Sequence, residues 1–246
     1  MQMATQTNSK FLQAHAFAAQ NTVGMFTNCT RACEGGLKAV SIAKELQMKS
    51  VLEESLMFST VSAYNAGNFR SCWTQVSYWY QYAHEQKDAF VQVGRATYLR
   101  AGLLCHLNNP QKANSDCERA MAKGDDGVMF ALQWDRHFAP MRVLALYRMG
   151  REAEADALLN VARTNVREQS FGPWNFVKCQ CVLDFLFEAH AKCCSLHKRK
   201  KAGRLQAAYT EMLGCLEKLI GEVPCLQPYR LYYQGLRYLM LDDRPR

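Results

Sequence analysis

The stretch GREAEADALLNVARTNV, residues 150–166, decides the fold. Gly150 supplies a turn residue, and Ala155, Leu158, Leu159 and Ala162 follow it at the i, i+3, i+4 and i+7 spacing of one helical face. Glycine tolerates the positive φ that ends a helix, and alanine allows two helix backbones to approach closely. The stretch therefore predicts a tight turn followed by a helix that packs closely on its neighbours.

Weaker copies of this pattern occur along the chain. The turn markers are Gly67, Asn108, Gly150 and Gly203, and the residues five positions after them are all small: Cys72, Ala113, Ala155 and Ala208. Twelve positions after the markers stand Trp79, Ala120, Ala162 and Cys215. A poorer copy runs through Glu34, Gly35 and Gly36 with Ala39 as its small residue, and a last turn is expected at Asp242 and Asp243. The pattern predicts consecutive antiparallel helical hairpins.

Composition supports a helical chain without strands. The 246 residues include 29 Ala and 26 Leu against 14 Val and 2 Ile, which favours helix formers over β-branched strand formers. We expect an all-α fold with helices at residues 9–25, 31–47, 51–66, 69–86, 88–107, 111–123, 127–149, 151–168, 174–197, 204–221 and 226–241.

The turn markers and the small residues after them resemble the tetratricopeptide-repeat (TPR) family. The resemblance covers residues 31–246 and rests on the sets Gly150, Ala155 and Ala162 and Gly203, Ala208 and Cys215. It implies a right-handed α-solenoid of antiparallel helical hairpins, with about five units and long helices. The marker spacings of 41, 42 and 53 residues exceed the family's period of about 34, so a solenoid of the HEAT type is the architectural alternative.

Two segments fall outside complete repeats. Residues 1–30 are expected to form an N-terminal helical or partly flexible extension before the repeat domain at 31–246. The residues from Leu241 to Arg246 indicate the turn into a further helix, so the final unit is expected to be half a repeat. Either the chain is an excised fragment, or a partner covers the exposed apolar edge of this unit.

The charge and the cysteines bear on partner and compartment. The net charge is +8, and much of the excess lies in a basic patch with no acid between residues 189 and 210: Lys192, Lys198, Arg199, Lys200, Lys201 and Arg204. Eleven cysteines spread over helix-like segments favour reduced thiols and an intracellular location, with the cytoplasm first and the nucleus or mitochondrion left open. No segment is apolar enough to span a membrane.

No enzyme signature is present in the sequence. Phosphate-binding glycine loops, the nucleophile elbow and the His-Glu-x-x-His zinc motif are all absent. A structural metal is the alternative for one group, Cys179, Cys181, His190, Cys193, Cys194 and His197, although no Cys-x-x-Cys knuckle occurs. We expect ordinary thiols there, no cofactor and no metal.

The family resemblance also implies candidate binding residues. In that architecture the first helix of each hairpin lines a concave face, and counting back from the turn markers selects eight positions: Glu54, Tyr64, Arg95, Tyr98, His137, Tyr147, Tyr229 and Tyr232. The expected function is a non-enzymatic scaffold that binds a partner polypeptide through this face or the edges of the superhelix, as a subunit of a larger assembly. The alternative is a protein that binds RNA or phosphate through the basic patch.

Overall fold

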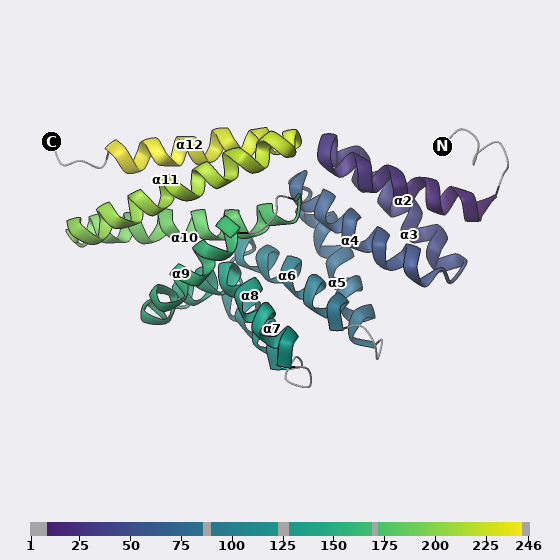
Figure 1. The fold of residues 1–246 in the computed structure, drawn as a ribbon, viewed down its shortest axis with the longest axis horizontal. Coiled ribbons are helices and arrows are strands. Elements are labelled where there is room, and N and C mark those ends of the chain that lie inside the picture. The colour runs from purple at the N-terminus through teal and green to yellow at the C-terminus, as the bar shows by residue number, and fades with distance from the viewer. Residues whose placement is uncertain (1–8, 86–89, 123–127, 169–171, 243–246) are drawn as a thin grey trace. The chain divides into compact units, whose positions relative to one another are not determined.

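The computed structural model describes residues 9–85, 90–122, 128–168 and 172–242, and within these residues there are helices and no strands. The all-α prediction is confirmed. Figure 1 shows the helices, whose bounds are α2 (Lys10–Thr27), α3 (Cys29–Glu45), α4 (Lys49–Asn65), α5 (Phe69–Glu85), α6 (Phe90–His106), α7 (Pro110–Ala122), α8 (Val128–Arg148), α9 (Glu152–Glu168), α10 (Asn175–Ser195), α11 (Arg199–Glu222), the short 3₁₀ helix η2 (Pro224–Leu226) and α12 (Gln227–Asp242).

The chain divides into two compact units. Unit 1 comprises Met1–Leu103 and Val223–Cys225, and unit 2 comprises Leu104–Glu222 and Leu226–Arg246. In unit 1, α2 packs on α3 and α4, and α4 also packs on α3 and α5. The helix α2, which lies in the segment expected as an N-terminal extension, packs on α3 and α4.

Unit 2 is built around α10. This helix contacts α8, α9, α11 and α12, and buried residues lie on every side of it from Phe176 to Cys193. Other helices in this unit also contact their sequence neighbours: α8 packs on α7 and α9, and α11 packs on α12. Consecutive helix–helix packing of this kind is consistent with a helical repeat.

The same turn geometry closes five helices. A residue with φ between +53° and +79° follows each of them: Gln47, Gly67, Asn108, Gly150 and His197. In every case the next N–H donates to the carbonyl five residues earlier at 2.8–2.9 Å, as Asn68 does to Ala63 and Lys198 does to Cys193. This is the Schellman motif, in which the N–H groups just after a helix donate hydrogen bonds to carbonyls of its last turn.

The turn residues also start the next helix, which keeps the connections short. The side chain of Asn68 accepts a hydrogen bond from the N–H of Ser71 at 3.1 Å, and the side chain of Asn109 accepts one from Lys112 at 3.4 Å. Each asparagine is therefore an N-cap directly after the left-handed residue. A turn this short keeps the end of one helix next to the start of the following helix.

Two of the expected turn markers are wrong. Gly203 lies inside α11, which begins at Arg199 and not at residue 204, and Gly35 and Gly36 lie inside α3. The fourth hairpin turns at His197. Five positions after His197 stands Ala202, which is buried, so the pattern of a small residue after the turn holds in the corrected register.

Gly36 has a different role, which is close packing. A Cβ atom at this position would lie 2.4 Å from Ser59 Cβ and 2.5 Å from Asn21 Nδ2. Asn21 and Ser59 are fully buried on α2 and α4. Glycine therefore allows three helices of unit 1 to meet at one point.

Candidate functional site

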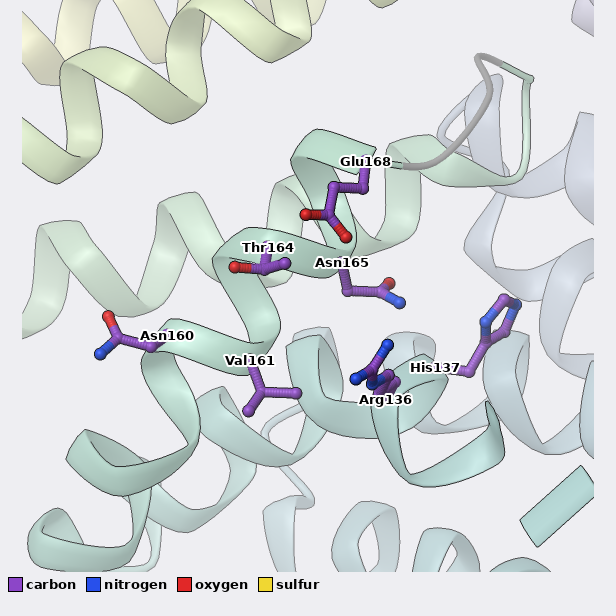
Figure 2. A pocket seen from close by; sticks show the side chains of 7 residues that line it. All are labelled: Arg136, His137, Asn160, Val161, Thr164, Asn165 and Glu168. Atoms are coloured by element: carbon purple, nitrogen blue, oxygen red, sulfur yellow. The ribbon is translucent and has the colours of Figure 1, made fainter. Parts of the chain in front are cut away.

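A polar pocket opens between α8 and α9 in unit 2, and Figure 2 shows the side chains that line it. Its volume is about 630 Å³, within the ~300–1,000 Å³ of ligand pockets. Six of its seven described lining residues are polar, and together they are Arg136, His137, Asn160, Val161, Thr164, Asn165 and Glu168. The pocket therefore suits a ligand with several hydrogen-bonding groups.

One buried amide directs an acceptor toward this pocket, and a proline lies in the helix that forms its α8 side. Asn165 is 9% exposed, its Oδ1 accepts no hydrogen bond from any described residue, and its carboxamide points from α9 toward the α8 side of the pocket (Figure 2). Pro140 lies inside α8 and has no N–H to donate to the carbonyl of Arg136, four residues earlier. A ligand that carries N–H or O–H donors would satisfy the Asn165 oxygen.

Beside the pocket, His137 meets a buried lysine. His137 Nε2 lies 3.5 Å from Lys178 Nζ, and Lys178 is only 1% exposed. Burial, together with the Lys178 charge, lowers the pKa of His137 to about 4, and burial lowers the pKa of Lys178 to about 7. At neutral pH, His137 is therefore a neutral imidazole at the pocket wall, and Lys178 lies behind it.

Farther along α10, a second polar group is enclosed. Asp184 accepts a hydrogen bond from Tyr233 Oη at 2.8 Å and lies 3.5 Å from His106 Nδ1. Burial raises the pKa of Asp184 to about 6, and burial with the nearby Arg148 charge lowers the pKa of His106 to about 4. At pH 7 the contact therefore joins a carboxylate to a neutral imidazole.

One turn beyond Asp184, an ion pair joins α8 to α10. Arg148 Nε lies 3.1 and 3.2 Å from the two oxygens of Glu188, and Arg148 Nη1 also donates to the carbonyl of Cys105. Tyr147 donates its hydroxyl to the Glu188 carbonyl at 3.2 Å. These half-buried contacts fix α8 on α10, and neither Arg148 nor Glu188 lines the pocket between α8 and α9.

A separate surface feature lies on α12. Tyr233 and Met240 face the core, and the opposite side exposes four large apolar residues: Leu231 (64% exposed), Tyr232 (57%), Tyr238 (67%) and Leu239 (60%). We call these four the α12 stripe. Gly235 lies between residues 231–232 and residues 238–239, and a Cβ atom added to it would have no other atom within 4 Å. Of these four residues, only Tyr232 was among the expected partner-binding positions, although residues 231, 235 and 238 have the spacing of one helical face.

The residues expected on a concave face divide into three groups. Tyr64 and Tyr98 are 0% and 5% exposed, so their prediction as accessible contact residues is wrong, because both fill the core of unit 1. Glu54, Arg95 and Tyr232 are exposed. Three are half-buried: His137 at the pocket, Tyr147 on Glu188, and Tyr229, whose ring centroid lies 4.4 Å from that of Phe176.

The basic patch lies on the last turn of α10 and the first turns of α11. Lys192 and Lys201 pair with acids on α9, at 2.5 Å from Glu152 and 2.5 Å from Asp156. The other four cations are exposed, and they are Lys198, Arg199, Lys200 and Arg204. Part of the patch is therefore neutralised by the neighbouring helix of the same unit.

The cysteines and histidines of residues 179–197 do not converge. Cys179 faces α11, with its Sγ 3.6 Å from the carbonyl of Met212, whereas the His190 ring lies 3.6 Å from the sulfur of Cys194 and His197 lies in the turn. Among the described residues no group of three or more His, Cys, Asp or Glu side chains is arranged to hold a metal ion.

No family model, curated protein or solved structure matches the chain. None of the helices in the described ranges is both long and apolar enough to cross a lipid bilayer.

Proposed function

We propose that this chain is a non-enzymatic protein-interaction module, a TPR-like right-handed α-solenoid that binds a partner polypeptide along its edge. The observation that carries the proposal is the α12 stripe. Its four side chains are each more than half exposed on one helix of 16 residues. Concentrated apolar surface of this kind marks interaction sites.

The stripe has the form of a helix-docking surface. Leu231 and Tyr238 are seven residues apart, and Gly235 stands between them. Glycine in a helix interior costs roughly 1 kcal/mol relative to alanine, and nothing among the described atoms excludes a Cβ there. A second helix that crosses at Gly235 would explain the glycine, because its backbone approaches most closely there, with Leu231 and Tyr238 as anchors on either side.

Charge defines the chemistry of this partner helix. The net charge of the chain is +8, and the exposed Arg237 on α12 lies outside the α12 stripe, because it follows Tyr233 by one turn of the helix. A second copy of the chain would bring like charges together, whereas an amphipathic helix with acidic residues beside its apolar face would complement the surface. We therefore propose an acidic amphipathic helix of another polypeptide as the occupant.

Three exposed or half-buried members of the concave-face set add candidate contact positions, separately in each unit. Glu54 and Arg95 offer charged contacts in unit 1, and His137 offers a neutral imidazole at the pocket of unit 2. These residues all lie thirteen positions before their turn residues, at the same register of the first helix of a hairpin.

The alternative function is RNA or phosphate binding through the basic patch. The four exposed cations at the start of α11 favour it, since positive charge at a helix N-terminus opposes the helix dipole and therefore has no local structural benefit. This reading predicts affinity for RNA that falls steeply with salt concentration. The partner-helix reading predicts protein binding that persists in ~0.5 M salt, where exposed charges are screened.

The test is purification of the tagged chain from lysate in parallel with two variants. The double variant Leu231→Ser/Tyr238→Ser removes the anchors, and Val23→Ser is the matched control because Val23 is also exposed, at 69%, on a different helix. We expect one protein to be retained by the wild type and the control and lost from the double variant. A synthetic peptide of its acidic amphipathic helix should then bind about 30-fold more weakly to the double variant.

Three results would contradict the proposal. The same proteins could be recovered from all three chains, or the helix peptide could bind the wild type and the double variant equally. The double variant could also differ only in self-association by sedimentation, which would make a second copy the occupant. Recovery of RNA alone, lost when salt is raised, would favour the alternative.

A further inference from the structure

Two cysteines far apart in the sequence lie in contact. All eleven cysteines of the chain are free thiols, and Cys29 Sγ lies 2.9 Å from Cys225 Sγ although the residues are 196 positions apart. Both belong to unit 1, Cys29 at the start of α3 and Cys225 in the segment Val223–Cys225. Neither cysteine was singled out by the sequence pattern.

Neighbouring groups hold the two sulfurs at this position. The carbonyl of Met25 accepts from Cys29 Sγ at 3.3 Å and from Cys225 Sγ at 3.6 Å, so one acceptor orients both thiols. Val223 is fully buried and anchors the segment that carries Cys225. Cys225 is half-buried and reachable from solvent, whereas Cys29 is 4% exposed.

We propose that Cys29 and Cys225 form an intramolecular disulfide when the chain meets a low-molecular-weight disulfide such as oxidised glutathione. A disulfide bond requires the sulfurs to approach to about 2.05 Å, so they need to move together by less than ~1 Å. The site is thus a pair of cysteines within unit 1 that can be oxidised. This proposal does not depend on the α12 stripe or on a partner helix.

The reaction has two exchange steps. The thiolate of Cys225 attacks one sulfur of oxidised glutathione, which forms a mixed disulfide and releases one glutathione thiolate. The thiolate of Cys29 then attacks Cys225 Sγ and releases the second glutathione thiolate. Two protein thiols and one glutathione disulfide become one protein disulfide and two reduced glutathiones, which take up the two thiol protons.

The electrostatics support this order. A hydrogen bond from Cys29 lowers the pKa of Cys225, and the same contact with burial raises the pKa of Cys29. The thiolate therefore forms first on the sulfur that solvent can reach. Cys105 and Cys181 also share a hydrogen bond, but both are 0% exposed, so a dissolved disulfide cannot reach them in the folded chain.

The test counts thiols after exposure of the reduced chain to oxidised glutathione under native conditions. We expect the count to fall from eleven to nine in the wild type, with one cross-linked peptide that contains Cys29 and Cys225, and to return to eleven after reduction. Cys225→Ser and Cys225→Ala should keep all ten of their thiols. Cys215→Ser, which removes another half-buried cysteine, should fall from ten to eight.

Several outcomes would overturn the proposal. The wild type could keep eleven thiols, or its cross-linked peptide could join other cysteines. Either Cys225 variant could still lose two thiols, which would show that another pair reacts. A stable glutathione adduct on Cys225 with Cys29 still free would show that the second step does not occur. Circular dichroism of each variant before oxidation identifies any chain that has not folded, and the second substitution at Cys225 then provides the comparison.

Discussion

Replacing Lys178 with methionine should stabilise the protein, and the gain should shrink as pH rises. Lys178 is 1% exposed and burial lowers its pKa from 10.5 to about 7. Between these values the unfolded chain holds a proton that the folded chain lacks, so stability from this group rises with pH. Below pH 7, this lowering of the Lys178 pKa reduces the free energy of unfolding by roughly 5 kcal/mol.

The Lys178→Met variant removes this titration and keeps a side chain of similar length. Its stability advantage over the wild type should therefore narrow by roughly 3 kcal/mol between pH 6 and pH 9. Urea unfolding followed by circular dichroism, in reducing buffer at several pH values in this range, measures that difference. Groups away from Lys178 titrate alike in both proteins and cancel. His137 loses the Lys178 charge in the variant, but burial is the larger cause of its lowered pKa and remains.

The matched control is Lys192→Met, near the other end of α10. Lys192 is 49% exposed and pairs with Glu152, so its loss should change stability by less than about 1 kcal/mol at any pH in the range. A difference between Lys178→Met and the wild type that stays constant from pH 6 to pH 9 would refute the reasoning, since it would mean that Lys178 titrates alike in folded and unfolded chains.

Four further substitutions test the packing, one turn and one buried hydrogen bond. Gly36→Ala should destabilise the protein by about 1–3 kcal/mol, because the added Cβ would overlap Ser59 on α4. Gly214→Ala is the control: open space surrounds this helical glycine, so alanine should stabilise the protein by about 0.5–1 kcal/mol. The urea midpoints of both variants measure these changes. Gly150→Ala should lower stability by about 1–2 kcal/mol, since φ is +79° there, and an unchanged midpoint would contradict the turn assignment. Tyr233→Phe should lose about 1.5–3 kcal/mol at pH 8, where Asp184 is charged, and less at pH 4.5, below its pKa of about 6; equal losses at both pH values would count against this assignment.

Much of the helical layout could be predicted from the sequence. Expected and observed bounds differ by three residues or fewer for all helices except α11, because apolar periodicity and the turn residues Gly67, Asn108 and Gly150 mark where helices end. Glycine and asparagine adopt the left-handed conformation readily, so local sequence carries that information.

The fourth hairpin turn could not be found in this way. His197 and Gln47 adopt the same left-handed conformation, but residues of these types rarely signal it. The run of Lys and Arg after His197 also resembles a solvated loop, whereas it forms the first turns of α11, with Lys201 paired to Asp156. The turn was therefore expected six residues too late, at Gly203. Asp184 stands thirteen positions before the observed turn residue His197, as His137 does before Gly150, and the sequence analysis did not select it.

The site was less predictable than the fold. Counting back from a turn selects a helix position but not its burial, and Tyr64 and Tyr98 proved to be core residues because neighbouring helices cover them. The pocket depends on Asn165 and Glu168 from the second helix of its hairpin, which the concave-face pattern did not include. The cysteine contact depends on residues 196 positions apart, which no local pattern encodes.

The most direct measurement of the central claim is amide hydrogen exchange on the chain, free and in complex with the partner recovered by purification. Protection should increase along α12, residues 227–242, with its largest gain around Gly235, and the Leu231→Ser/Tyr238→Ser variant should show no gain. Unchanged exchange along α12, with protection confined to other helices, would contradict a partner helix docked on the α12 stripe.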